Sequence, residues 1–316
     1  VPESYYNGLN ENKKAKKDDI LYSVVGSFGK PVYVDFDKQM VFQRHIAILR
    51  PKRNVNARFI YYTMLNPQFY KLVDKLAIGC SQRTVTLDTL RNIEVNLPDK
   101  DIQDKMVGIL SLIDEKIDIN NNVNDNLSAM AYDIYMHNFF SKKPNAKLKD
   151  ILTESEKSAI QVGEAKTSNG EYPFFTSGAT ILKWNEPFVD GRNCFLNTGG
   201  NADVKFYVGK AAYSTDTWSI SAKSEMSDYL YLMLFSIKPE LDQKFFQGTG
   251  LKHLQKPLLK DRPIYVPEKL ELEAFNRQVI PMFDIISENT RENQQLTSLR
   301  DWLLPMLMNG QATISD

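Results

Sequence analysis

The feature that most constrains the fold of this chain is an internal repeat at an offset of 169 residues. GCSQRTVTLDTLRNIEVNLPDK at 79–100 aligns without a gap with GTGLKHLQKPLLKDRPIYVPEK at 248–269, so that Pro98 meets Pro267. Upstream the register drifts, with FIYYTML (59–65) over YLYLMLF (229–235) and DDILYSVVGSFGKPVYV (18–34) loosely over NCFLNTGGNADVKFYV (193–208). The repeat predicts two copies of one structural unit.

Downstream, the repeat continues as a heptad seam in both copies. Apolar residues are spaced by fours and threes, which is typical of paired helices. The seam positions are Met106, Leu110, Ile113, Ile117, Asn120, Asn124, Leu127, Ala131 and Ile134, then Phe275, Val279, Met282, Ile286, Asn289, Asn293, Leu296, Arg300 and Leu303. Asparagines at Asn120, Asn124, Asn289 and Asn293 therefore occupy matching seam positions.

These asparagines have two interpretations. They could belong to a frayed, solvated stretch, or they could fix the register, because a slipped helix would leave a buried amide unpaired in an apolar seam. Their recurrence in the second copy favours the register device. The first helix leads from the first repeated unit into the second, and the second helix leaves the second unit. The pair is therefore expected to be antiparallel.

The sequence predicts a mixed α/β fold with two domains separated by a long antiparallel coiled coil and an internal pseudo-two-fold repeat. The expected parts are a first domain at 1–98, a first long helix at 99–141, a second domain at 142–266, a second long helix at 267–310 and a tail at 311–316. Runs such as KPVYVDF and KFYVGKAAYS predict strands. ARFIYYTMLNPQFYKLVDKLA predicts a helical stretch interrupted at Pro67.

The charge alternates along the chain although the net charge is zero. Residues 1–98 hold 15 basic and 9 acidic residues, and 142–266 hold 17 and 14. The two predicted helical segments are acidic, with 3 basic against 8 acidic residues at 99–141 and 4 against 8 at 267–316. A neutral total therefore conceals two basic globules, which is compatible with a nucleic-acid partner.

Several classes of protein are disfavoured. Cys80 and Cys194 lie far apart and suggest neither a disulfide framework nor a zinc site. No apolar run is long enough for a membrane span, and no signal peptide is recognisable, so a cytoplasmic protein is expected. The chain lacks an initiator Met, which suggests a fragment or a trimmed chain. NPQF at 66–69 only partly matches the NPPF-type motif of amino-methyltransferases, and no catalytic or metal-binding set emerges.

The chain resembles the DNA specificity subunits of type I restriction–modification enzymes. The residues that carry the resemblance are KKDDILYSVVGSFG, the stretch from GCSQRTVTLDTLRNIEVNLPDK to INNNVNDNL, YPFFTSG with GKAAYSTDTWSI, and LEAFNRQVIPMFDIISENTRENQQLTSLRDWLLPMLMNGQ. The resemblance implies two target-recognition domains, each reading half of a bipartite DNA site, and helices that dock two methyltransferase subunits. S-adenosylmethionine is then expected on the methyltransferase, and restriction subunits can accompany the complex.

One departure concerns the first domain. By the repeat, residue 1 lies near residue 175 of the second copy, so no counterpart of KLKDILTESEKSAIQVGEAKTSNGEY precedes it. The first domain is therefore expected to be N-terminally incomplete, or completed by a segment absent from this chain.

Candidate DNA-binding residues fall into three groups. A basic run is expected to contact phosphates, which gives affinity without sequence information. Side chains that can pair bidentately are the favoured base readers, some of them beside glycine turns in matching positions of the repeat. The phosphate group is Lys13, Lys14, Lys16 and Lys17; the base readers are Gln43, Arg44, Gln82, Arg83, Lys252 and His253; weaker candidates are Thr176, Ser177, Asn201, Lys205 and Lys210.

Two functions remain open at this point. The first is a non-catalytic DNA-reading scaffold, and the second is a coiled-coil protein-interaction adaptor without DNA specificity. Binding to bipartite and scrambled duplexes, with and without a methyltransferase, separates them. The base sequence that is read depends on loop conformation and does not follow from the sequence.

Overall fold

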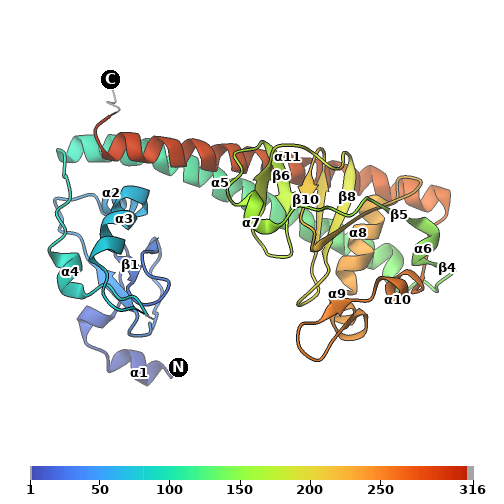
Figure 1. Ribbon diagram of the computed structural model, residues 1–316, viewed down its shortest axis with the longest axis horizontal. Helices are drawn as coiled ribbons and strands as arrows, with labels where there is room; N and C mark the ends of the chain where they lie inside the picture. Colours follow the sequence, from blue (N-terminus) through green and yellow to red (C-terminus); the bar gives the residue numbers. More distant parts are fainter. Residues whose placement is uncertain (1, 81, 312–316) are drawn as a thin grey trace. The chain divides into compact units, whose positions relative to one another are not determined.

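A computed structural model describes residues 2–80 and 82–311 (Figure 1). The chain forms two compact units: unit 1 is Val1–Ile117 with Gln295–Asp316, and unit 2 is Asp118–Gln294. Two long helices, α5 (Lys100–Tyr135) and α11 (Lys269–Met308), each contribute residues to both units. Both helices were expected from the heptad seam. The expected tail at 311–316 lies outside the described residues from 312 onward.

Unit 1 is built on a three-stranded antiparallel sheet with the order β2-β1-β3. Ile20 of the central strand pairs with Tyr33 on one side and Leu49 on the other. Ile20 and Tyr22 are fully buried and form a core with Met64. In chain order, the elements of unit 1 before α5 are α1 (Glu3–Asn7), η1 (Glu11–Lys13), β1 (Ile20–Ser23), β2 (Pro31–Tyr33), β3 (Ile46–Leu49), α2 (Ala57–Leu65), α3 (Pro67–Leu76) and α4 (Leu87–Arg91).

The predicted helix break at Pro67 is confirmed. Pro67 is the first residue of α3, where its missing N–H costs no helical hydrogen bond. Asn66 is buried between α2 and α3, and its side chain caps α3 by accepting a hydrogen bond of 2.9 Å from the N–H of Gln68. The asparagine of NPQF therefore has a structural role as a helix cap.

In unit 1 the ends of α5 and α11 pack against each other and against α2. Phe59 of α2 lies in one buried cluster with Leu110 of α5 and Leu304 of α11. Arg300 of α11 forms an ion pair of 2.9 Å with Asp114 of α5, and the hydroxyl of Tyr62 donates to the same carboxylate at 2.8 Å. The start of α5 thus lies beside the end of α11, as expected for an antiparallel pair.

Unit 2 is built on a four-stranded antiparallel sheet with the order β5-β11-β8-β9, beside a three-stranded sheet with the order β10-β6-β7 (Figure 1). In chain order, the elements of unit 2 between α5 and α11 are η2 (Met136–Phe140), β4 (Ala146–Lys147), α6 (Leu148–Ile151), β5 (Leu152–Glu154), α7 (Val162–Ala165), β6 (Tyr172–Phe175), β7 (Leu182–Trp184), β8 (Arg192–Asn197), β9 (Val204–Val208), β10 (Ala212–Tyr213), β11 (Thr217–Ala222), α8 (Ser227–Ser236), α9 (Lys238–Glu240), η3 (Leu241–Phe245), β12 (Phe246–Gln247), β13 (His253–Leu254), α10 (Lys256–Lys260) and β14 (Pro263–Ile264).

The main core of unit 2 lies between this sheet, α8 and the long helices. Cys194 of β8, Ile220 of β11, Leu230 of α8 and Phe275 of α11 are all buried in one cluster. Helix α8 is apolar on most of its surface and is buried over most of its length, as expected for a helix enclosed by other elements. The packing joins the sheet to α11 through α8 within this unit.

The asparagines of the seam pair across the two helices inside unit 2. Asn120 Nδ2 donates to Asn293 Oδ1 at 2.9 Å, and Asn289 Nδ2 donates to Asn124 Oδ1 at 2.8 Å. Asn120 is buried. The residue number rises from 120 to 124 along α5 while that of the partner falls from 293 to 289 along α11, so the helices run antiparallel at this level. The interpretation of the asparagines as paired seam residues is thereby supported over a frayed stretch.

The predicted repeat is visible as two similar arrangements of elements. Strands β1, β2 and β3 of unit 1 have the same pairing as β8, β9 and β11 of unit 2. Helices α2 and α4 take the chain positions of α8 and α10. Unit 2 also contains β5 and the β10-β6-β7 sheet. The mixed α/β class expected from the sequence is confirmed, while the expected domain boundaries stay predictions.

Candidate nucleic-acid interface

In unit 1, two loops are joined at the end of strand β1. We call residues 79–80 and 82–84 the first glycine turn; they follow α3 and precede α4. The N–H of Gly26 donates to the carbonyl of Arg83 at 3.0 Å, and the N–H of Val85 donates to the carbonyl of Val24 at 2.8 Å. These bonds fix the first glycine turn beside the loop that follows β1.

The side chain of Arg83 is held at three points. Its Nη1 forms an ion pair of 2.5 Å with Asp74 Oδ1, and its Nη2 donates to the backbone carbonyl of Asp74. The guanidinium also lies over the ring of Phe28, with 5.7 Å to the ring centroid. Gln82 next to it is exposed. Arg83, predicted as a base reader, is thus anchored to α3 in this structure.

Unit 2 repeats the arrangement. We call residues 248–253 the second glycine turn. The N–H of Gly200 donates to the carbonyl of Lys252 at 2.9 Å, and the N–H of Leu254 donates to the carbonyl of Thr198 at 3.0 Å. Gly199 and His253 form a single antiparallel bridge, as Val25 and Thr84 do in unit 1.

Lys252 is anchored in the same way as Arg83. Its ammonium forms an ion pair of 2.9 Å with Asp242 Oδ2, while Asp242 Oδ1 accepts the N–H of Ala202 at 3.0 Å. These two hydrogen bonds, of which the one from Lys252 is the larger cause, hold the pKa of Asp242 below its usual value. Asp242 therefore ties the second glycine turn to the loop between β8 and β9.

A third loop of unit 2 joins this group through the backbone of Asp216. Its carbonyl accepts hydrogen bonds from the N–H and the hydroxyl of Thr198, at 2.9 and 3.0 Å, and from the hydroxyl of Ser177 at 3.1 Å. The structure therefore brings together Ser177, Lys252 and His253, which are distant in sequence. The carboxylate of Asp216 itself is at an exposed position.

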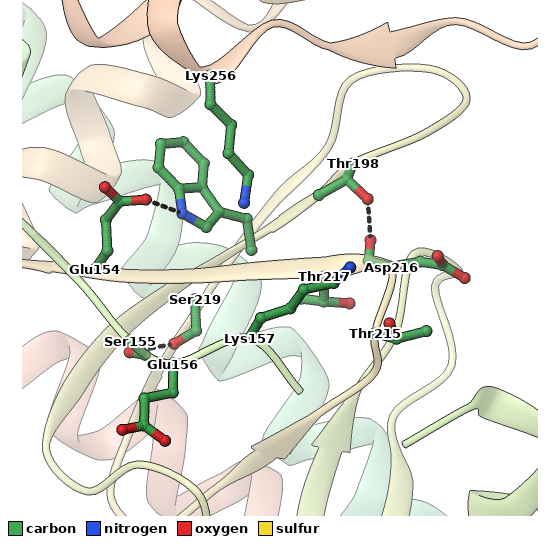
Figure 2. Close-up of a pocket in the computed structure, with 11 residues that line it drawn as sticks. Glu154, Ser155, Glu156, Lys157, Thr198, Thr215, Asp216, Thr217, Ser219 and Lys256 are labelled. Carbon is green, nitrogen blue, oxygen red and sulfur yellow. Dashed lines mark hydrogen bonds between the residues drawn. The ribbon is translucent and has the colours of Figure 1, made fainter. Parts of the chain in front are cut away.

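A pocket lies beside these loops, and Thr198 and Asp216 form part of its lining (Figure 2). The ring of Trp218 is buried, and its Nε1 donates to Glu154 at 2.9 Å. The ammonium of Lys256 lies 4.8 Å from the centroid of that ring. Burial is the largest cause that lowers the pKa of Lys256. The pocket offers hydrogen-bond donors, which phosphates and base edges can use, and acceptors, which base edges can use.

The predicted phosphate-binding lysines differ in their surroundings. Glu11 forms ion pairs with Lys14 at 2.9 Å and with Lys16 at 3.0 Å. The two lysines lower the pKa of Glu11 to about 2, mainly through these hydrogen bonds. Lys13 and Lys17 are exposed. Lys13 and Lys17 are therefore the better candidates for phosphate contacts.

The remaining candidates divide into exposed and internally bonded residues. Gln43, Arg44, Asn201 and Lys210 are exposed. Thr176 is buried, and its hydroxyl accepts the N–H of Gly178 at 3.1 Å. The ammonium of Lys205 donates to the carbonyl of Thr176 at 2.8 Å. Thr176 and Lys205 thus stabilise the loop that carries Ser177.

Sequence reasoning did not single out Asp74, Asp242 or Thr198. Asp74 and Asp242 are separated by 168 residues, close to the repeat offset. A comparison of acidic residues along the repeat would have found this pair. Thr198 carries no such signal, because its role depends on the position of Asp216 in space.

Within residues 2–80 and 82–311, no cluster of three or more His, Cys, Asp or Glu side chains could hold a metal ion. None of the helices described there is long and apolar enough to cross a membrane.

The family model of the type I restriction modification DNA specificity domain matches residues 3–129 and 142–297, one match for each copy of the repeat. The chain belongs to this family. The resemblance expected from the sequence is confirmed, and the chain is a specificity subunit, the non-catalytic component of a type I restriction–modification system.

The sequence aligns with two specificity subunits over most of their length. The type I restriction enzyme HindI specificity subunit of Haemophilus influenzae is 22% identical, with 95% of this chain and 87% of the relative covered. The MjaIX specificity subunit of Methanocaldococcus jannaschii is 19% identical, with 84% and 71% covered. A crystal structure of the S subunit of a type I restriction-modification system from M. genitalium shares the fold, with a TM-score of 0.57, 17% identity, and 95% and 84% coverage.

Proposed function

We propose that this specificity subunit reads a bipartite double-stranded DNA site, with one half-site read by each unit. The observation that carries the proposal is the recurrence of one loop arrangement. Each unit holds a glycine turn against the loop after its central strand, through the bonds of Gly26 to Arg83 and of Gly200 to Lys252. Loops held by a rigid scaffold are where binding residues usually lie.

Base reading is assigned to exposed polar residues of the glycine turns and of the loop between β2 and β3. Side-chain amides, guanidinium groups and imidazoles can distinguish base pairs in the major groove. Gln43, Arg44, Gln82 and His253 are exposed and supply such groups. Lys13 and Lys17 supply phosphate contacts, which add affinity but carry no sequence information directly.

We further propose that two methyltransferase subunits dock on the long helices, and that S-adenosylmethionine is bound by those subunits. Support comes from a second apolar stripe on α5, outside the seam. It consists of Ile102, Ile109 and Leu112 in unit 1 and of Ile119, Val123 and Met130 in unit 2, all of which are exposed. Their spacings of seven, three, seven, four and seven place them on one helix face. An exposed apolar stripe is suited to a protein partner.

The test uses the purified chain, alone and with its methyltransferase, on bipartite duplexes and on scrambled duplexes of the same composition. The complex is expected to prefer the bipartite duplex and to methylate it, while the chain alone neither methylates nor cleaves DNA. Equal weak binding to both duplexes in the presence of the methyltransferase would instead favour the protein-interaction adaptor. Methyl transfer by the chain alone would contradict its non-catalytic role.

A further inference from the structure

The two glycine turns bring their first and fourth residues together in a similar way, and positions 82 and 251 correspond at the repeat offset of 169 residues. Gly79 and Gly248 both have a positive φ, of +95° and +150°. A Cβ atom at Gly79 would lie 2.7 Å from the carbonyl oxygen of Gln82, and a Cβ at Gly248 would lie 2.6 Å from that of Leu251. Only glycine tolerates this approach, so each turn folds its fourth residue back over its first.

The residue after each of these positions is fixed on two sides. The carbonyls of Arg83 and Lys252 accept hydrogen bonds from Gly26 and Gly200, and their side chains pair with Asp74 and Asp242 as described above. Each of these two residues is therefore held within its own unit by bonds of both its main chain and its side chain. The preceding residue, at 82 or 251, is held in place by its neighbour while its own side chain stays exposed.

The two exposed side chains differ in chemistry. Gln82 carries an amide, which can donate and accept at once. Leu251 is apolar and 65% exposed, and its Cδ2 lies 3.7 Å from the position that a Cβ would take on Gly199. In the major groove, a glutamine amide matches the N6 and N7 atoms of adenine, and an apolar side chain matches the methyl group of thymine.

We propose that Gln82 and Leu251 are equivalent specificity-determining residues, with Gln82 reading an adenine in one half-site and Leu251 contacting a thymine methyl group in the other. This inference rests on the proposed function. It gives the anchored cations Arg83 and Lys252 the task of fixing the turns. It also explains why an exposed leucine stands in a polar loop at the position of a base-reading glutamine.

The experiment exchanges the two side chains in the full chain, assembled with its methyltransferase. Gln82→Leu and Leu251→Gln are each used to select duplexes from a library that is randomised in both half-sites. Gln82→Leu is expected to reduce the preference for adenine at one position of one half-site by roughly five- to a hundred-fold. Leu251→Gln is expected to replace thymine by adenine at one position of the other half-site. In each case the unaltered half-site keeps its sequence.

Matched controls make the same chemical changes outside the turns. Gln68→Leu on α3 and Leu258→Gln on α10 alter exposed residues and are expected to select the original sequence. Thermal unfolding of all variants checks that the fold is retained. Unchanged preference at every position in folded Gln82→Leu and Leu251→Gln variants, or an equal change in both half-sites, would overturn the inference. Failure of the unaltered complex to select any sequence would instead overturn the proposed function.

Discussion

At the residue scale, ion pairs distinguish the basic side chains that the sequence offers as candidate DNA contacts. Lys14 and Lys16 are paired with Glu11, and Arg83 and Lys252 are paired with aspartates, whereas Lys13 and Lys17 are exposed. The sequence shows all of these residues as equally basic. Charge counts alone therefore do not show which of these cations already have an acidic partner within the chain.

Replacing Lys13 and Lys17 together by alanine is expected to weaken binding to all duplexes alike. Each lost phosphate contact lowers the slope of log affinity against log salt concentration by about one. The measurement is a salt titration of DNA binding by the methyltransferase complex. The matched control is the double replacement of Lys14 and Lys16, which are already paired with Glu11 and should change the slope less. A larger change in the control would contradict the assignment.

A second residue-scale prediction concerns the ion pair between Arg192 and Asp228. Arg192 of β8 donates twice to the buried carboxylate of Asp228 on α8, at 2.6 Å each, and also pairs with Asp284 of α11. Removing one partner leaves a half-buried charge incompletely paired. Asp228→Ala is expected to lower the free energy of unfolding by about 3 kcal/mol, measured by urea denaturation.

The control for this pair is Asp284→Ala. The Asp284 side chain is 49% exposed, so its removal is expected to cost no more than about 1 kcal/mol. Equal losses for the two variants would show that burial does not determine the strength of this interaction.

At the scale of elements, two sets of contacts hold the long helices. One set is the asparagine layers, the hydrogen bonds between seam asparagines of α5 and α11, and the other is the group of bonds at the N-terminus of α11. The seam and its asparagines were predictable because they repeat with the helical period. The cap of α11 was not, because it combines residues from two segments that lie far apart in the chain. Tyr265 and Lys142 both bond to Glu271 in the first turn of the helix, together with the N–H of Glu268.

Asn293→Ala tests the asparagine layers. The variant removes the acceptor of Asn120 and the donor to Asn121, while Asn120 keeps its hydrogen bond of 2.7 Å to Glu292. The expected loss is about 1 kcal/mol of unfolding free energy, measured by urea denaturation. Asn122→Ala, at an exposed position of α5, is the control and should change stability by less than about 0.5 kcal/mol. Identical stability of Asn293→Ala and the unaltered chain would argue against a structural role for the pair.

The lowered pKa of Glu271 predicts that the stability of the fold depends on pH. The hydrogen bond from Tyr265, followed by that from Lys142, lowers the pKa of Glu271 from 4.5 to about 2. Since the folded pKa lies below the unfolded value, the contribution to stability is present above pH 4.5 and is lost as the pH falls towards 2. The difference in Tm between the unaltered chain and Glu271→Gln should therefore shrink over this interval. A difference that stays constant from pH 6 to pH 2 would contradict this prediction.

At the scale of the whole molecule, the long helices α5 and α11 each contribute residues to both units. Asn124 bonds to Asn289, so these positions face each other in the pair. Inserting seven residues after Asn124 and seven immediately before Asn289 keeps the seam in phase. Each helix grows by about 10.5 Å. We expect the unspecified spacer between the half-sites to grow by about three base pairs, at roughly 3.4 Å each.

Selection from duplexes with variable spacers, using the lengthened chain with its methyltransferase, measures this change. Insertion of three residues at the same two positions is the control, because it takes the seam out of phase and should destabilise the helix pair. Recovery of the original spacer by a well-folded seven-residue variant would show that the helices do not set the spacing.

The sequence by itself determined the repeat, the two long helices, the break at Pro67 and the asparagine positions. These features depend on periodicity and on backbone preferences of neighbouring residues, which a sequence displays directly. It also pointed to the glycine turns, because Gly79 and Gly248 recur at the repeat offset.

Only the tertiary structure decided how the residues of the candidate interface are held and which of them are buried. Arg83 and Lys252 are anchored by Asp74 and Asp242, Thr176 is buried, and Leu251 is exposed. The loops of unit 2 meet at the carbonyl of Asp216, which joins segments from three parts of the chain. Such contacts depend on strand pairing between distant segments, and the alternation of residues along one strand carries no record of its neighbour.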